Sequence, residues 1–201
     1  MSLVTPTRSQ THTFKEQQSK FISILGPFED INSFKSWLSD LLRKEYHDAS
    51  HICWGYRIHA ESQLEENLSD AGEPSGTAGL PILNALKQEN LLNCGLAVIR
   101  YFGRTKLGKR GLIDAYGKSA RGVIEKTSCK KWVKMEKYAI TSPMVFYGDL
   151  AKSISRLDGK IIDDQSSEIL NWDIEIQSGK LNELIQTIRT VTKGEGDLEK
   201  L

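Results

Sequence analysis

Apolar residues recur at helical spacing in several segments of the chain, and in other segments they alternate with polar residues or run together. The segment after Asp30 shows the helical pattern most clearly, because its apolar residues form one stripe and Asp30 is suited to cap a helix. The predicted helices span residues 31–42, 81–89, 112–126, 148–157 and 180–192. The predicted strands span residues 12–26, 49–60, 94–102, 138–144, 160–164, 169–177 and 194–201.

In residues 49–60, large apolar side chains alternate with mostly polar ones, which predicts a half-buried strand. Ile52, Trp54, Tyr56 and Ile58 share one face, while His51, Cys53, Gly55, Arg57 and His59 share the other. A Cys–His nucleophile, or a metal site that includes His47, is compatible with this second face. However, no Cys-x-x-Cys or His-Glu-x-x-His spacing is present, so ordinary packing is the favoured interpretation. We therefore predict no catalytic residue, no metal site and no cofactor.

A polar, lysine-rich stretch around residues 128–137 marks the predicted boundary between two domains, 1–127 and 138–201. We expect residues 1–10 to be a frayed terminus and the acidic segment 61–67 to be a mobile connection. The elements predicted beyond residue 138 follow one another in the order β-α-β-β-α-β. This order is that of the ferredoxin-like split motif, and the chain is therefore predicted to be an α+β protein.

Two glycine-rich loops, 69–79 and 103–111, each precede a predicted helix. Such loops leave backbone amides free to face an anion at a helix start. The first loop contributes the candidate residues Asp70, Gly72, Glu73, Ser75, Gly76, Thr77 and Gly79. Asp70 and Glu73 could act as an acid–base or cation-binding pair, but a capping and turn role is favoured.

The second loop matches the phosphate-binding pattern G-x-x-x-x-G-K, from Gly103 to Lys109, and lies between a predicted strand and a predicted helix. The next residue is Arg110, where that motif has a hydroxyl side chain to bind magnesium. No second apolar strand ending in Asp is evident to hold the ion either. The match is therefore interpreted as accidental for nucleotide chemistry, although the loop could still contact a phosphate.

Charge is distributed unevenly along the chain, although the formal net charge is only +1. Residues 100–134 contain 11 Lys or Arg and 2 acids, a local net charge of +9, whereas residues 158–201 are net acidic. A basic region of this kind attracts phosphate-rich partners or simply keeps helix faces hydrated. The apolar content of 39% is that of a globular protein, and no apolar run is long enough to span a membrane. Three widely spaced cysteines and no signal-peptide pattern favour free thiols in the cytoplasm.

Three motifs together resemble the Impact family, in the two-domain bacterial form called YigZ-type. They are His47-x-x-Ala-x-His-x-Cys-Trp54, Ser69-Asp-x-Gly-Glu-Pro-Ser-Gly-Thr-Ala-Gly79, and Arg100-Tyr-Phe-Gly-x-x-Lys-Leu-Gly-x-x-Gly-Leu112 followed by Ala115-Tyr-Gly117. The resemblance implies a first domain like the second domain of ribosomal protein S-five, and a second domain like a ferredoxin-like domain of elongation factor G. It also implies a link to regulation of translation and carries over no catalytic residues.

Two departures from the family pattern bear on the ligand. Ala71 replaces the usual second Asp of the first loop, which weakens any mechanism based on two carboxylates. Arg104 and Arg110 replace glycines of the second loop, which makes that loop more basic and less open to close backbone contact. An open phosphate-contacting surface fits these changes better than a snug nucleotide pocket.

The sequence thus predicts a cytoplasmic, non-enzymatic protein that binds RNA or a ribosomal or translation partner. The candidate contacts are Arg100, Arg104, Lys106, Lys109, Arg110, Lys118, Arg121, Tyr101 and Tyr116. Because Tyr101 alternates with Arg100 and Phe102, only one of these sets can face a ligand. Two other interpretations stay open: an enzyme or binder acting on a phosphorylated small molecule at the glycine loops, and a protein-interaction module with an acidic second domain.

Overall fold

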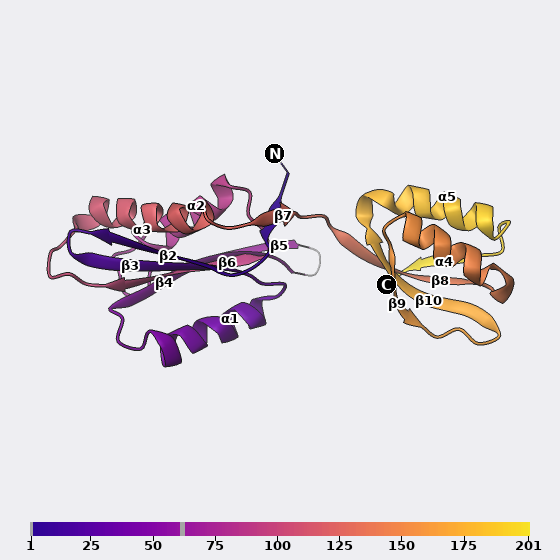
Figure 1. The fold of residues 1–201 in the computed structure, drawn as a ribbon, viewed down its shortest axis with the longest axis horizontal. Coiled ribbons are helices and arrows are strands. Elements are labelled where there is room, and N and C mark those ends of the chain that lie inside the picture. The colour runs from indigo at the N-terminus through magenta and orange to yellow at the C-terminus, as the bar shows by residue number, and fades with distance from the viewer. Residues whose placement is uncertain (1, 61–62) are drawn as a thin grey trace. The chain divides into compact units, whose positions relative to one another are not determined.

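The chain divides between Trp132 and Val133 into two units, residues 1–132 and 133–201. The computed structural model describes residues 2–60 and 63–201 (Figure 1). Each unit has hydrophobic cores of its own. The division falls within the segment 128–137, where the composition of the sequence changes.

Unit 1 is built on a five-stranded sheet in which every pair of neighbours is antiparallel. In spatial order its strands are β2 (Gln10–Glu16), β3 (Ser19–Pro27), β6 (Cys94–Tyr101), β4 (His51–Ala60) and β5 (Gln63–Ser69). Helix α1 (Ile31–Asp40) covers one face, and helices α2 (Gly79–Gln88) and α3 (Gly108–Ile124) cover the other (Figure 1). The sheet therefore lies between two helical layers, each with its own core.

Strand β4 confirms the predicted alternation but not the predicted half-burial. Ile52 and Tyr56 join the core beneath α1, whereas Cys53 joins the core beneath α2 and α3. The middle of the strand is buried on both faces because helices cover both. The polar residue Arg57 is tolerated there because its guanidinium donates to a carboxylate of Glu66 at 2.9 Å and to the Leu91 carbonyl at 2.8 Å.

Two segments expected to lack regular structure form strands instead. Within residues 1–10, β1 (Val4–Pro6) pairs with β7 (Cys129–Lys131), so both ends of unit 1 are fixed to each other. The segment expected to be a mobile connection belongs largely to the edge strand β5, although residues 61–62 lie outside the described part of the chain. One of its acidic residues, Glu66, forms ion pairs with both Arg57 and Lys87. The polar stretch 128–137, predicted as the boundary between the domains, also contains strand β7 and the start of the strand that follows it.

Unit 2 has the predicted order of strands and helices. Its elements are β8 (Met135–Pro143), α4 (Tyr147–Arg156), β9 (Lys160–Asp164), β10 (Ile169–Gln177), α5 (Leu181–Val191) and β11 (Asp197–Lys200). The antiparallel sheet has the order β11-β8-β10-β9, and both helices cover one face (Figure 1). Burial alternates along β10 around the fully buried Trp172, as expected for a sheet covered on one side. Among the helices that the structure describes, none is long and apolar enough to cross a bilayer.

Candidate functional site

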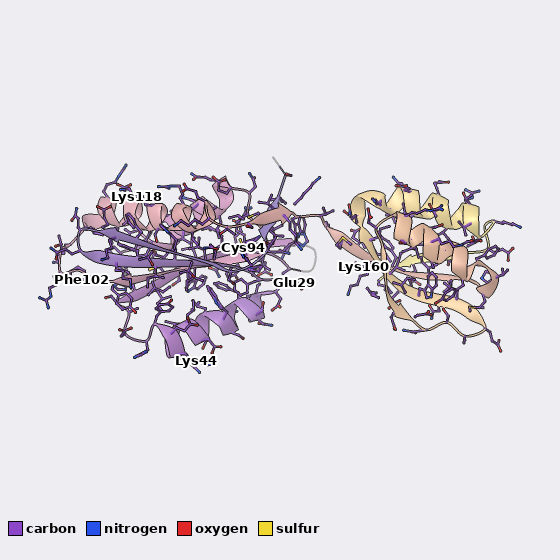
Figure 2. The ribbon with its side chains drawn as sticks, in the orientation of Figure 1. Glu29, Lys44, Cys94, Phe102, Lys118 and Lys160 are labelled. Atoms are coloured by element: carbon purple, nitrogen blue, oxygen red, sulfur yellow. The ribbon has the colours of Figure 1, made fainter. Side chains whose placement is uncertain are left out.

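The loops of interest gather at one end of the unit 1 sheet. The strand register places Lys20 opposite Tyr101, His51 opposite Arg100, and Trp54 opposite Ser69. The turn at 17–18 and the loops 46–50, 70–78 and 102–107 therefore all lie at this end, which we call the loop end. Figure 2 labels Phe102 at this end and Lys118 on helix α3. The sheet thus brings together both glycine-rich loops of the sequence.

Asp70 fixes the first glycine-rich loop from within. Its carboxylate accepts hydrogen bonds from the backbone N–H groups of Gly76, Ala78 and Gly79 at 2.8–2.9 Å. Burial acts to raise the pKa of Asp70, but the three N–H groups act against it and the net pKa is lowered. The loop also requires Gly76, whose φ of +76° favours glycine. The capping and turn role predicted for Asp70 is confirmed, and its carboxylate is not available as a free acid or base.

Glu73 points inward and forms a buried ion pair. Its carboxylate oxygen Oε1 accepts from Nη1 of Arg100 at 2.6 Å and from the hydroxyl of Tyr116 at 2.9 Å. The side chains of Arg100 and Glu73 are only 5% and 4% exposed. Together with Cys53, these residues form what we call the buried polar cluster: Cys53, Glu73, Arg100 and Tyr116. It joins the first loop, strands β4 and β6, and helix α3.

Arg100 is enclosed on all sides, so its predicted role as a phosphate contact is wrong. The guanidinium carbon lies 5.6 Å from the ring centre of Phe21 and 5.4 Å from that of Phe102. Nη2 reaches the hydroxyl of Ser19 at 3.4 Å, while Nε has no hydrogen-bond partner among the described residues. An arginine held between two aromatic rings and a carboxylate fixes the end of β6 and cannot reach a ligand in solvent.

Tyr116 is fully buried, so its predicted role in stacking on a base is also wrong. Its ring packs edge-on against Phe21, with ring centres 5.3 Å apart. Burial raises the pKa of Tyr116, and the neighbouring Cys53 and Glu73 add to the effect, so the phenol stays protonated and donates to Glu73. Tyr101 lies on the opposite face of β6, where its hydroxyl donates to Asp48 at 2.9 Å.

Cys53 is a protected thiol rather than a nucleophile. Its sulfur donates to the Asp70 carbonyl at 3.0 Å and lies 3.4 Å from the hydroxyl of Tyr116. Burial raises the pKa of Cys53 to about 12, so the thiolate is scarcely populated at neutral pH. His51 does lie on the same face, but its Nδ1 is 2.9 Å from the Ala71 carbonyl and no contact joins it to the thiol. Within residues 2–60 and 63–201, no group of three or more His, Cys, Asp or Glu side chains could hold a metal ion.

The remaining predicted cations are exposed. We define the basic surface as Arg104, Lys106, Lys109, Arg110, Lys118 and Arg121. The spacing of residues 110, 118 and 121 places them on the outward face of α3, and the others lie in or beside the second loop. Arg110 pairs with Asp114 at 3.3 Å and Lys118 with Glu16 at 3.4 Å. The other four form no ion pair with any residue that the structure describes, and neither Glu65 nor Glu66 neutralises the group.

The first glycine of the second loop, Gly103, has a packing origin, whereas Gly108 has a φ of +70° and open space around it. A Cβ atom at Gly103 would overlap the backbone of Gln18 and Ser19 in the turn between β2 and β3. Gly103 is therefore needed for contact between two loops, not for the approach of a phosphate. This supports the interpretation that the resemblance to a nucleotide-binding loop is accidental.

Comparison with known proteins places this site in a family. The family model described as the Impact N-terminal domain matches residues 17–124, more than half of the chain. The chain belongs to the Impact family. Every member of the buried polar cluster and of the basic surface lies within the matched Impact region.

Curated Impact relatives extend over nearly the whole chain. The Bacillus subtilis protein "IMPACT family member YvyE" is 26% identical over 199 residues, covering 99% of this chain and 91% of the relative. The Escherichia coli protein "IMPACT family member YigZ" is 24% identical over 194 residues, covering 96% and 95%. A crystal structure titled as that of a hypothetical protein is 24% identical with a TM-score of 0.76, covering 100% of this chain and 98% of that one. This likeness shows that the two chains share the same fold.

Sequence reasoning missed the residues that surround Arg100 in this Impact domain. Ser19, Phe21 and Phe102 enclose its guanidinium, and the first two come from a strand about 80 positions earlier. No local pattern shows such a contact before the pairing of β3 with β6 is known. A signal did exist for Tyr116, because Leu112, Tyr116 and Ala120 recur at helical spacing with the other buried residues of α3.

Thiol reactivity provides a direct test of the buried polar cluster. In the folded protein we expect Ellman's reagent to modify Cys129 alone, because Cys53 and Cys94 are fully buried and Cys129 is exposed. All three thiols should react once the protein is unfolded. Rapid modification of Cys53 in the folded protein, identified by peptide mass spectrometry, would contradict the protected environment described here.

Proposed function

We propose that this protein binds RNA through the basic surface of unit 1 and acts in the regulation of translation. The observation that supports this is the gathering of six exposed cations on the second loop and the outward face of α3, four of them without an ion pair among the described residues. Cations on one face follow a phosphate backbone, whereas scattered cations only keep a surface hydrated. The association of the Impact family with translation agrees with an RNA partner.

The buried polar cluster supports the basic surface from below. Arg100 lies one residue before the end of strand β6, close to the second loop, and Phe102 covers its guanidinium. Gly103 packs on the turn between β2 and β3. The loop that carries Arg104 and Lys106 therefore leaves the sheet from a fixed point. A fixed origin lowers the entropy lost when these side chains contact phosphates.

The carboxylates considered for an enzyme have structural partners. Asp70 accepts three backbone hydrogen bonds, and Glu73 is occupied by Arg100 and Tyr116. A general acid or base must instead reach the proton that it transfers. These contacts favour RNA binding over chemistry on a phosphorylated small molecule.

The salt dependence of RNA binding tests the proposal. We expect the double variant Lys106→Gln, Lys109→Gln to bind single-stranded RNA more weakly than the wild type for every sequence. The slope of log affinity against log salt concentration should fall by about 0.7 for each lost phosphate contact, or about 1.4 for both. Fluorescence anisotropy with a labelled oligonucleotide, repeated from low to moderate salt, measures both quantities.

A matched control removes the same charge from the opposite face of the sheet. The variant Lys35→Gln, Lys44→Gln changes two exposed lysines, one on α1 and one on the short π-helix Leu41–Glu45 that follows it, and should leave the affinity and slope unchanged. Absence of RNA binding by the wild type at low salt would overturn the proposal. An equal effect of both double variants would show that net charge, rather than this surface, drives binding.

A further inference from the structure

A groove of about 270 Å³ lies between helices α2 and α3, beside the basic surface. Leu80 on α2 and Ile113 on α3 stand on its two sides, and both are large apolar residues left 45% and 39% exposed. Gly117 also lines the groove, and the guanidinium of Arg121 lies over it, 3.3 Å from where a Cβ atom of residue 117 would be. The groove thus combines apolar walls with a guanidinium.

Polar groups line the same groove. Asn84 and Gln88 come from successive turns of α2, and Arg121 comes from α3. None of these three side chains makes a hydrogen bond or ion pair with another residue of the described chain. The groove also holds one carboxylate, Asp114, which is engaged with Arg110 at 3.3 Å. Two amides and one guanidinium are therefore free to bind a ligand placed between the apolar walls.

The shape and chemistry of the groove fit a small planar group. Its volume is just below the range of roughly 300–1,000 Å³ of pockets that hold drug-sized ligands, which suits a smaller group. A helical peptide would need a longer groove with anchors over two turns. Asn and Gln amides each offer donors and an acceptor, which match the edge of a nucleobase. Proteins that recognise single-stranded RNA place unstacked bases against apolar or guanidinium surfaces and bind their edges in this way.

We propose that this groove holds one unstacked nucleobase of the RNA strand that the basic surface binds. Leu80 and Ile113 contact the faces of the base, Asn84 and Gln88 bind its edge, and Arg121 contacts the adjoining phosphate. Arg121 lies both in the groove and on the basic surface, and the carboxylate that lines the groove, Asp114, is paired with Arg110. One strand can therefore occupy the groove and the basic surface together. This inference rests on the proposed function, to which it adds a source of base preference.

The experiment measures base preference separately from affinity. Labelled 12-mers of rA, rC and rU are titrated with the full chain, with the double variant Asn84→Ala, Gln88→Ala, and with the control Asn32→Ala on α1. The two groove residues are exposed on a helix, where alanine favours folding. We expect the wild type and the control to prefer one oligonucleotide by about 5-fold or more, the discrimination typical of amide contacts to a base. In the groove variant this preference should fall to about 2-fold or less, with an unchanged salt slope.

A second measurement locates the base. In the ¹⁵N-labelled full chain, the nucleoside monophosphate of the preferred base should shift the side-chain amide signals of Asn84 and Gln88, whereas inorganic phosphate should not. RNA binding without base preference, or with a preference that the groove variant retains, overturns the nucleobase site and leaves the basic surface intact. Absence of RNA binding at low salt overturns both. Monophosphate shifts confined to other residues also overturn the inference.

Discussion

Replacing Glu73 with glutamine is expected to lower the free energy of unfolding of unit 1 by about 3–5 kcal/mol. The substitution keeps the size of the side chain but removes the negative charge beside the guanidinium of Arg100, which is 2.6 Å away in a 5% exposed position. A buried cation without a counter-charge is costly, and Arg100 already has one nitrogen, Nε, without a hydrogen-bond partner among the described residues. Amide hydrogen exchange in β6 measures the loss within unit 1, and exchange in β10 of unit 2 serves as an internal reference.

Two further variants separate this effect from a general loss of charge. Asp40→Asn breaks the exposed pair between Asp40 and Lys44 and should cost less than about 1 kcal/mol. Adding Arg100→Met to Glu73→Gln removes the unpaired cation and should recover part of the lost stability. If Glu73→Gln costs no more than Asp40→Asn, the ion pair does not hold the loop end together.

The elements of both units were largely predictable because their apolar periodicity is local. The stripe in α1 and the alternation along β4 and β10 each follow from a few neighbouring residues. The edge strand β5 was not predictable in this way, because its acidic residues suggest a solvated connection. Glu66 is accommodated there only because Arg57 of β4 and Lys87 of α2 lie beside it. Its fit depends on contacts that the local sequence does not contain.

The candidate site also contains residues that the local sequence predicts and residues whose role depends on distant contacts. The exposed cations of the basic surface follow from composition and helical spacing, since a surface charge needs no specific partner. Arg100 has the same chemistry in the sequence but the opposite environment, because its carboxylate partner Glu73 comes from a loop 27 residues earlier. The pattern of charges in the sequence therefore indicates where a basic surface lies. It cannot distinguish a cation exposed to a ligand from one that forms a buried ion pair within the protein.

The buried ion pair and the exposed cations act together at the loop end. The buried polar cluster neutralises its own cation, so the positive charge left for a partner comes from side chains whose backbone this cluster positions. Loss of the cluster should thus weaken RNA binding indirectly, by freeing the loops. Loss of Lys106 and Lys109 should weaken it directly, without a change in stability. Measuring both properties on both sets of variants separates a positioning role from a contact role.

The second large effect is expected for Asp70. In Asp70→Ala the backbone N–H groups of Gly76, Ala78 and Gly79 lose their common acceptor, which should lower the free energy of unfolding of unit 1 by about 2–3 kcal/mol. Asp70→Asn keeps an acceptor oxygen but not the charge, and should cost about 1 kcal/mol. Hydrogen exchange in β6, again referenced to β10, distinguishes these losses from global effects.

The stability that Asp70 provides should depend on pH in one direction. Because the pKa of Asp70 is lowered by folding from its ordinary value of 3.8, its stabilising effect is complete above that value and is lost as the pH falls through the lowered pKa. The stability difference between the wild type and Asp70→Asn should therefore be largest near neutral pH and should shrink on acidification below about pH 4. Urea unfolding from pH 7 to pH 3 measures this difference. A difference that stays constant or grows towards low pH would mean that the carboxylate does not hold the loop through its charge.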